Sequence, residues 1–148
     1  MKIIGGIFIL CAGVLISYFY EKEQRLKIVY LSKIADFIHF ARSQIEFFSL
    51  PYNKIIESYT ENEDTRSLIR DGFKEYLDIL SLEDKKNIKA FFSSIGKGFA
   101  TEELSLCDYT VSYIEKSNDK NKAECPNKIK IFRSMALFVA ISIIILLV

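Results

Sequence analysis

The chain is poor in the residues from which most catalytic and metal sites are built. Its 148 residues include one histidine, three cysteines, two prolines and no tryptophan. Cys11, Cys107 and Cys125 are far apart and form no Cys-x-x-Cys pair, so neither a zinc site nor a disulfide framework is predicted. Free thiols in a reducing compartment are the simpler interpretation. His39 has no recognisable nucleophile beside it, and we expect it in solvent or at the edge of the core.

An excess of charge of either sign is also missing. Lysine and arginine number 20 and aspartate and glutamate number 19, so charge gives no reason to expect nucleic acid. All the acidic residues lie between Glu21 and Glu124. Apolar segments therefore flank a charged middle, and the length leaves room for one small domain.

The first apolar segment, Ile3–Tyr20, contains no charged residue and is close to the ~20 residues of a membrane-spanning helix. A cleaved signal peptide is the alternative, but no small-x-small cleavage site follows the segment. We therefore predict a retained transmembrane helix over residues 1–20.

The last apolar segment, Met135–Val148, would extend only about 21 Å as a helix, which is less than a ~30 Å hydrocarbon core. A buried core helix and an interfacial segment are alternatives. Apolar residues cover all its faces, however, and Ile129 and Phe132 can lengthen it, which favours a second transmembrane helix over residues 129–148.

Basic residues indicate the orientation of the two predicted spans. By the positive-inside rule, they place the middle domain, residues 21–128, in the cytoplasm. The basic residues that border this domain are Lys22, Arg25, Lys27, Lys128, Lys130 and Arg133.

The middle domain begins with a helical pattern. Apolar residues recur every three or four positions, and neither glycine nor proline interrupts residues 14–48, so one long helix is predicted. Ser49 is expected to cap a second helix that begins near Pro51. The residues expected to be buried on the long helix are Leu26, Tyr30, Ile34, Phe37, Ala41, Ile45 and Phe48.

Further helices are predicted to follow. A third is expected from a cap at Asp64 to Leu80, and a fourth from the capping box Ser81-Leu-Glu-Asp84. A fifth is expected to begin at a Thr101 cap and to kink or break around Ala123–Pro126 before the tail. Strand patterns are scarce, so the predicted fold class is all-α: a membrane-anchored antiparallel helical bundle with N-terminal and C-terminal transmembrane helices. The residues expected on the buried seam of the fifth helix are Leu104, Cys107, Val111, Ile114 and Asn118.

Gly96-Lys97-Gly98 raises the question of a phosphate-binding loop. Such a loop needs serine or threonine after the lysine and a strand before it, and this sequence has neither. Gly96 is instead predicted to end one helix, in a corner that leads into the next. No catalytic residue, cofactor site or metal site is predicted, and an enzyme is not expected.

Short segments along the whole chain support a family resemblance. Lys2-Ile-Ile-Gly-Gly begins the first span, Glu46 stands five residues before Pro51, Ile95-Gly96 precedes Phe99, and a Leu-Leu-Val tail closes the chain. This organisation resembles the stage III sporulation protein AB family of endospore-forming bacteria. In that family leucine usually follows the proline, where this chain has Tyr52, and the stretch interrupted here by Pro126 is usually a continuous helix.

The resemblance implies a helical domain similar to the cytoplasmic domains of type II secretion F and pilus C platform proteins. Such proteins contact a secretion-type ATPase in the inner membrane, and the sporulation relatives belong to the channel between mother cell and forespore. We therefore expect a non-enzymatic component in the mother-cell membrane facing the forespore. Its expected partners are the ATPase and other channel subunits, and a homo-oligomer is left open.

The two corners are the candidate partner-binding segments, the alternative being that their residues only shape turns. A different hypothesis is a small membrane regulator that binds a neighbouring enzyme or transporter, unrelated to sporulation. The candidate partner-binding residues are Glu46, Phe47, Leu50, Pro51, Gly96, Lys97 and Phe99.

Overall fold

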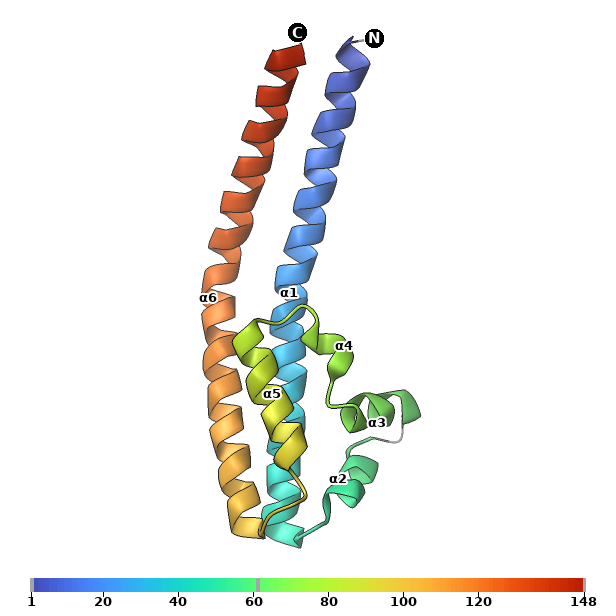
Figure 1. Ribbon diagram of the computed structural model, residues 1–148, viewed down its shortest axis with the longest axis vertical. Coiled ribbons are helices and arrows are strands. Elements are labelled where there is room, and N and C mark those ends of the chain that lie inside the picture. The colour runs from blue at the N-terminus through green and yellow to red at the C-terminus, as the bar shows by residue number, and fades with distance from the viewer. Residues whose placement is uncertain (1, 61, 148) are drawn as a thin grey trace. The chain divides into compact units, whose positions relative to one another are not determined.

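The computed structural model describes residues 2–60 and 62–147, without the side chains of residues 2–10, 144, 146 and 147. Within this part of the chain every regular element is a helix, so the all-α prediction is confirmed (Figure 1). The helices are α1 (Lys2–Phe48), α2 (Tyr52–Tyr59), α3 (Glu63–Arg70), α4 (Lys74–Leu77), α5 (Leu82–Ser94) and α6 (Ala100–Leu147).

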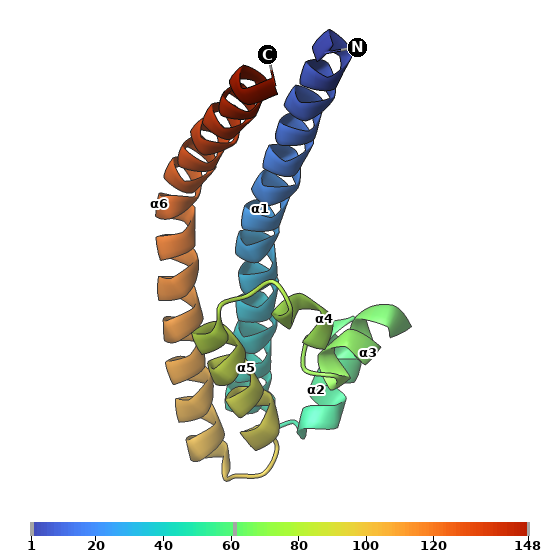
Figure 2. The ribbon, with the colours of Figure 1, turned by 45° about the horizontal axis from the view of Figure 1, so that its top comes forward.

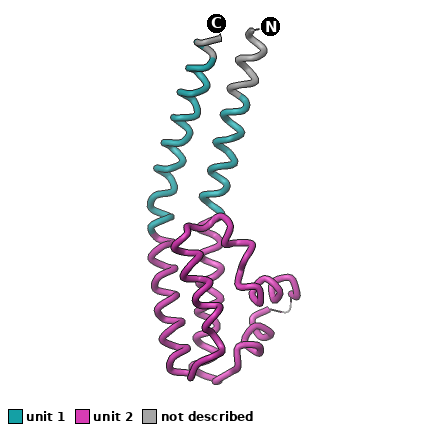
Figure 3. The backbone as a smooth tube through the Cα atoms, in the orientation of Figure 1, with its two compact units in different colours: residues 1–26, 120–148 teal, residues 27–119 magenta. Residues whose placement is uncertain are grey.

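The chain forms two compact units (Figure 3). The terminal unit combines Met1–Leu26 with Lys120–Val148, and thus the beginning of α1 with the end of α6. The central unit, Lys27–Asp119, contains the rest of these two helices together with α2, α3, α4 and α5.

Helix α1 is one continuous helix of 47 residues, as the absence of helix-breaking residues from 14 to 48 predicted. Its apolar stripe is buried at Ile34, Phe37, Ala41 and Ile45. The stripe ends there, because Phe48 is 66% exposed, and the prediction that Phe48 is buried was wrong. The other two members of the predicted stripe, Leu26 and Tyr30, are half-buried.

Ser49 ends α1 instead of capping α2, which corrects the prediction. Its φ of 49° is left-handed, and its backbone N–H donates to the Ile45 carbonyl over 3.1 Å. This arrangement satisfies one of the carbonyls left over at the end of a helix. The residue at the N-cap of α2 is Pro51, whose side chain has no hydrogen bond to offer.

The third predicted helix is divided in two, so its prediction as one helix from Asp64 to Leu80 was wrong. Asn62 caps α3 by accepting a hydrogen bond from the Asp64 N–H over 2.9 Å. Gly72 and Phe73 then have positive φ values of 65° and 55°, and no helix continues through two such residues. The turn directs Phe73 into the core, where it is 3% exposed.

The predicted cap at the start of α5 is confirmed at Ser81, whereas the Asp84 side chain bonds the Ser81 hydroxyl and also joins α5 to α6. Ser81 Oγ accepts a hydrogen bond from the Asp84 N–H over 3.1 Å. The buried Asp84 carboxylate accepts from the hydroxyls of Ser81 at 2.6 Å and Ser117 at 2.7 Å. Burial, together with this carboxylate, raises the pKa of Tyr113 to about 12. A carboxylate with several hydroxyl donors can remain buried at little cost.

At the corner between α5 and α6, the predicted helix end at Gly96 is confirmed, and the predicted N-cap at Thr101 was wrong. Gly96 has a φ of 80° directly after the C-cap of α5. Helix α6 begins one residue before Thr101, and the Phe99 carbonyl accepts from the Glu102 and Glu103 N–H groups at 2.9 and 3.0 Å. Glu102 and Glu103 lie in the first turn, where acidic side chains complement the helix dipole.

Replacing Gly96 with valine is expected to lower the free energy of unfolding by about 1–2 kcal/mol, because a β-branched residue is strained at positive φ. An added Cβ would also come 3.1 Å from Tyr52 Cβ. Gly96→Asn is the matched control, since asparagine tolerates the left-handed region and meets the same neighbour. Thermal unfolding of the full-length protein checks this. Equal melting temperatures for the valine variant and the wild type would contradict it.

Helix α6 runs through Pro126 without a break, so of the predicted kink or break the break was wrong. The proline is exposed, while Cys125 and Ile129 beside it are each 8% exposed. Burial of the neighbouring side chains within the terminal unit offsets the lost hydrogen bond, because tertiary packing supplies most helical stability. Earlier in α6, the predicted seam is buried at Cys107, Val111, Ile114 and Asn118 and half-buried at Leu104.

The two predicted membrane spans fall partly on residues that the structure leaves out. Over the described residues, none of the helices combines the length and apolar character that crossing a membrane requires. The side chains of residues 1–10 in the first predicted span, and of 144 and 146–148 in the second, lie outside that part of the chain. Both spans stay predictions from the sequence.

Candidate docking surface

The two corners singled out in the sequence lie at one end of the central unit. One joins α1 to α2 and the other joins α5 to α6, and both views place them side by side (Figures 1 and 2). Gly96 in the second corner is so close to Tyr52 after the first that an added Cβ would be 3.1 Å away. Segments about fifty positions apart in the sequence therefore form one surface.

A surface pocket of about 290 Å³ lies where the corners meet. Leu50, Pro51 and Gly96 line it, so three of the candidate residues share one site. Tyr52 contributes its ring, and burial raises the pKa of the Tyr52 phenol, so this lining group is uncharged at neutral pH. The other lining residues are Ile45, Ser49, Gly98, Ala100 and Glu103.

Exposed phenylalanines accompany this pocket. Phe47 is 74% exposed and Phe99 is 79% exposed, and each is within three positions of a lining residue. Phe48, which we had assigned to the core, adds a third exposed ring. Large exposed apolar side chains, aromatic ones above all, are typical of surfaces that contact another protein.

Glu46 and Lys97 differ in their surroundings. Arg42 Nη1 donates to Glu46 Oε2 and Arg42 Nε to Asp108 Oδ1, each over 2.5 Å. Hydrogen bonds from Arg42 to Asp108 and then to Glu46 raise the pKa of the guanidinium and link α1 to α6. Glu46 is thus paired with Arg42 within α1, and it is Asp108 that connects Arg42 to α6. Glu46 and Lys97 are both exposed. We call Phe47, Phe48, Leu50, Pro51, Gly96, Lys97 and Phe99 the corner surface.

Two side chains of types that often carry chemistry, His39 and Cys107, have different surroundings. His39 is exposed, as expected, and its Nε2 lies 2.9 Å from Glu115 Oε1 on α6. Burial raises the pKa of the Cys107 thiol to about 12, so the thiolate that a nucleophile requires is scarce. Among the described residues, no group of three His, Cys, Asp or Glu side chains could hold a metal ion.

Comparisons with models of protein families, with curated proteins and with solved structures found no match to this chain. The resemblance to the stage III sporulation protein AB family therefore stays a prediction. It depends on short segments of the sequence, of which Glu46 to Pro51 and Ile95 to Phe99 lie at the two corners.

Proposed function

We propose that the protein is a non-enzymatic, membrane-anchored assembly component that docks a protein partner through the corner surface. The observation that carries the proposal is the convergence of both corners around one pocket, with Phe47, Phe48 and Phe99 exposed at neighbouring positions of the same two corners. Exposed aromatic side chains near a pocket of mixed polar and apolar lining suit a partner that buries its own apolar residues against them. A lysine at its edge, Lys97, suits a carboxylate on that partner.

The proposed anchors are the apolar segments over residues 1–20 and 129–148, with the central unit in the cytoplasm. Support comes from the absence of charged residues in Ile3–Tyr20 and in Ser134–Val148, and from the basic residues between them. Two tethers would keep the corner surface near the bilayer and raise its effective concentration for membrane-bound partners.

The family resemblance supports a particular partner. It favours a secretion-type ATPase, or another subunit of a sporulation channel, in the mother-cell membrane facing the forespore. The corner surface itself requires only a partner with apolar side chains and some negative charge. A neighbouring enzyme or transporter, regulated by this protein, is the alternative that the experiment has to separate.

Photocrosslinking in sporulating cells tests the proposal. A photoreactive amino acid at Phe47 or at Lys97 is expected to capture the same partner, because both positions belong to the corner surface. The control probe is placed at Leu82, which is 85% exposed at the start of α5, and should not capture it. Partners are identified by mass spectrometry.

Each outcome is decisive for one part of the proposal. Recovery of a secretion-type ATPase or channel subunit from Phe47 and Lys97 supports the assembly role. Recovery of an unrelated membrane enzyme or transporter instead favours the regulator. Equal capture from Leu82 would contradict the corner surface as the docking site.

A further inference from the structure

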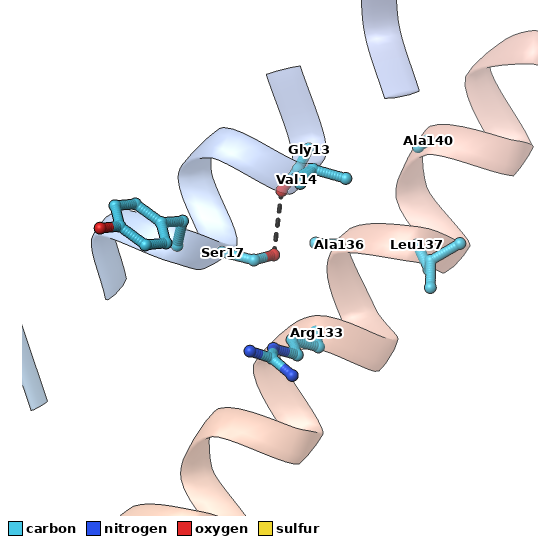
Figure 4. Close-up of a pocket in the computed structure, with 8 residues that line it drawn as sticks. Gly13, Val14, Ser17, Arg133, Ala136, Leu137 and Ala140 are labelled. Atoms are coloured by element: carbon cyan, nitrogen blue, oxygen red, sulfur yellow. Dashed lines mark hydrogen bonds between the residues drawn. The ribbon is translucent and has the colours of Figure 1, made fainter. Parts of the chain in front are cut away.

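Within the terminal unit, α1 and α6 approach each other at small residues. A Cβ on Gly13 would lie 3.8 Å from the Ala136 carbonyl oxygen and 3.9 Å from Ala140 Cβ. Ser17 is buried, and its hydroxyl donates to the Gly13 carbonyl over 2.9 Å, so it needs no partner from outside the helix (Figure 4). Small residues four positions apart on both helices allow the backbones to come close.

A surface pocket of about 260 Å³ is lined by residues of both helices here. Val14, Tyr18 and Leu137 form its larger walls, together with the small residues just named. Along α6 its lining runs from Arg133 to Ala140, so a guanidinium stands at one end of an otherwise apolar groove (Figure 4).

The Arg133 end of the groove carries an excess of positive charge. Glu21 accepts hydrogen bonds from Arg25 and from Arg133, so one carboxylate faces two guanidiniums. The bond from Arg25, with a further contribution from Arg133, lowers the pKa of Glu21 and keeps it ionised. Over residues 20–26 and 128–133 the two helices together have five basic residues against two acidic ones, Glu21 and Glu23, so this end of the groove is positive.

Contacts between α1 and α6 place these basic residues at a similar height along the two helix axes. Tyr20 and Phe132 stack with ring centroids 4.1 Å apart, next to the Glu21–Arg133 ion pair. Lys22 and Lys130 are within three positions of these contacts, which is less than one helical turn along the axis. Aromatic and basic side chains at one level, beside apolar segments, are typical of the headgroup region of a membrane.

We propose that this groove binds an anionic phospholipid, with one acyl chain along Val14, Leu137 and Ala140 and the phosphate at Arg133. The inference rests on the proposed membrane anchoring, and it adds a ligand and a site. A guanidinium bonds a phosphate through charge-assisted hydrogen bonds, and the surplus of positive charge favours lipids with a net negative headgroup.

The test is lipid binding to the full-length protein, purified from membranes in mild detergent. Native mass spectrometry follows retention of phosphatidylglycerol and phosphatidylcholine with the same acyl chains, added in equal amounts. We expect one phosphatidylglycerol to be retained in preference. Arg133→Gln should weaken that retention about fivefold to tenfold, the loss expected for one basic residue near anionic headgroups. Val14→Trp, at an exposed position of the groove wall, should block the acyl chain and abolish retention.

Lys128→Gln is the matched control for charge. It removes one positive charge from the same helix, where Lys128 pairs with Glu124 at 2.7 Å and does not line the groove. Its lipid retention should stay within about twofold of wild type. Equal losses for Arg133→Gln and Lys128→Gln would overturn the groove and leave only diffuse attraction between charges.

Membrane fractionation separates this inference from the proposal on which it rests. A wild-type protein that is extracted from membranes by alkaline carbonate would overturn the anchoring, and the lipid site with it. A protein that resists extraction, yet retains both lipids equally or retains phosphatidylglycerol in the Val14→Trp variant, would overturn the lipid site alone.

Discussion

Phe37→Ala is expected to lower the free energy of unfolding by about 3–5 kcal/mol, the loss typical of a fully buried phenylalanine. Phe37 on α1 is 0% exposed. Its ring contacts those of Tyr59 on α2 and Phe92 on α5, with centroids 5.2 and 6.1 Å away. Removing it leaves a cavity where α1 meets the helices packed on it, and these aromatic neighbours are too constrained to fill the space. Denaturant unfolding of the full-length protein, followed by circular dichroism, measures the loss.

Phe48→Ala is the matched control for that measurement. It makes the same chemical change on the same helix, but at a side chain that is 66% exposed. We expect a change within about 0.5 kcal/mol, as for most surface substitutions. Equal losses at Phe37 and Phe48 would mean that Phe48 is packed against something, and would remove it from the corner surface.

Periodicity predicted which face of α1 is buried, but it could not locate the end of that face. Residues spaced by three or four share one side of a helix whatever lies beyond it, so Phe48 continued the pattern set by Phe37 and Ile45. What ends the buried face is the left-handed turn at Ser49, which leads the chain away into α2. A serine at positive φ has no strong sequence signal, because serine is common in caps, loops and turns.

Two further predictions, the single third helix and the break at Pro126, were wrong because packing overrides the local preference of a residue. Phe73 is a poor candidate for a positive φ, yet its burial in the core outweighs a strain of order 1–3 kcal/mol. Pro126 is a poor candidate for the interior of a helix, yet buried neighbours hold α6 through it. Gly96 and Ser81 were predicted correctly because their roles depend on the backbone within a few residues.

In the candidate site, too, the local features could be predicted from the sequence and the packing could not. Each corner could be recognised from its own residues, since proline and glycine mark turns. That the corners meet depends on how α1, α5 and α6 pack, which no local pattern states. The pairing of Gly13 and Ser17 with Ala136 and Ala140 is likewise a property of the register between two helices that are far apart in sequence.

The combined change of Phe47, Phe48 and Phe99 to serine is expected to weaken partner capture by at least about tenfold. Each ring is more than half exposed in the isolated protein. Burying one such ring fully at an interface contributes about 1.5–3 kcal/mol, and 1.4 kcal/mol is already a tenfold change in affinity. Capture is measured as the yield of the crosslink from Lys97 to the partner that the wild-type protein captures.

Melting temperature decides how a loss of capture is interpreted. The triple variant should melt within a few degrees of wild type, because exposed rings contribute little to folding. Leu82→Ser with Tyr109→Ser is the control, since these exposed apolar residues, at 85% and 64%, lie outside the corner surface. Undiminished capture by the triple variant, or equal loss in the control, would contradict docking through these rings. Loss of capture at an unchanged melting temperature would separate Phe37, which holds the fold, from the three phenylalanines that face the partner.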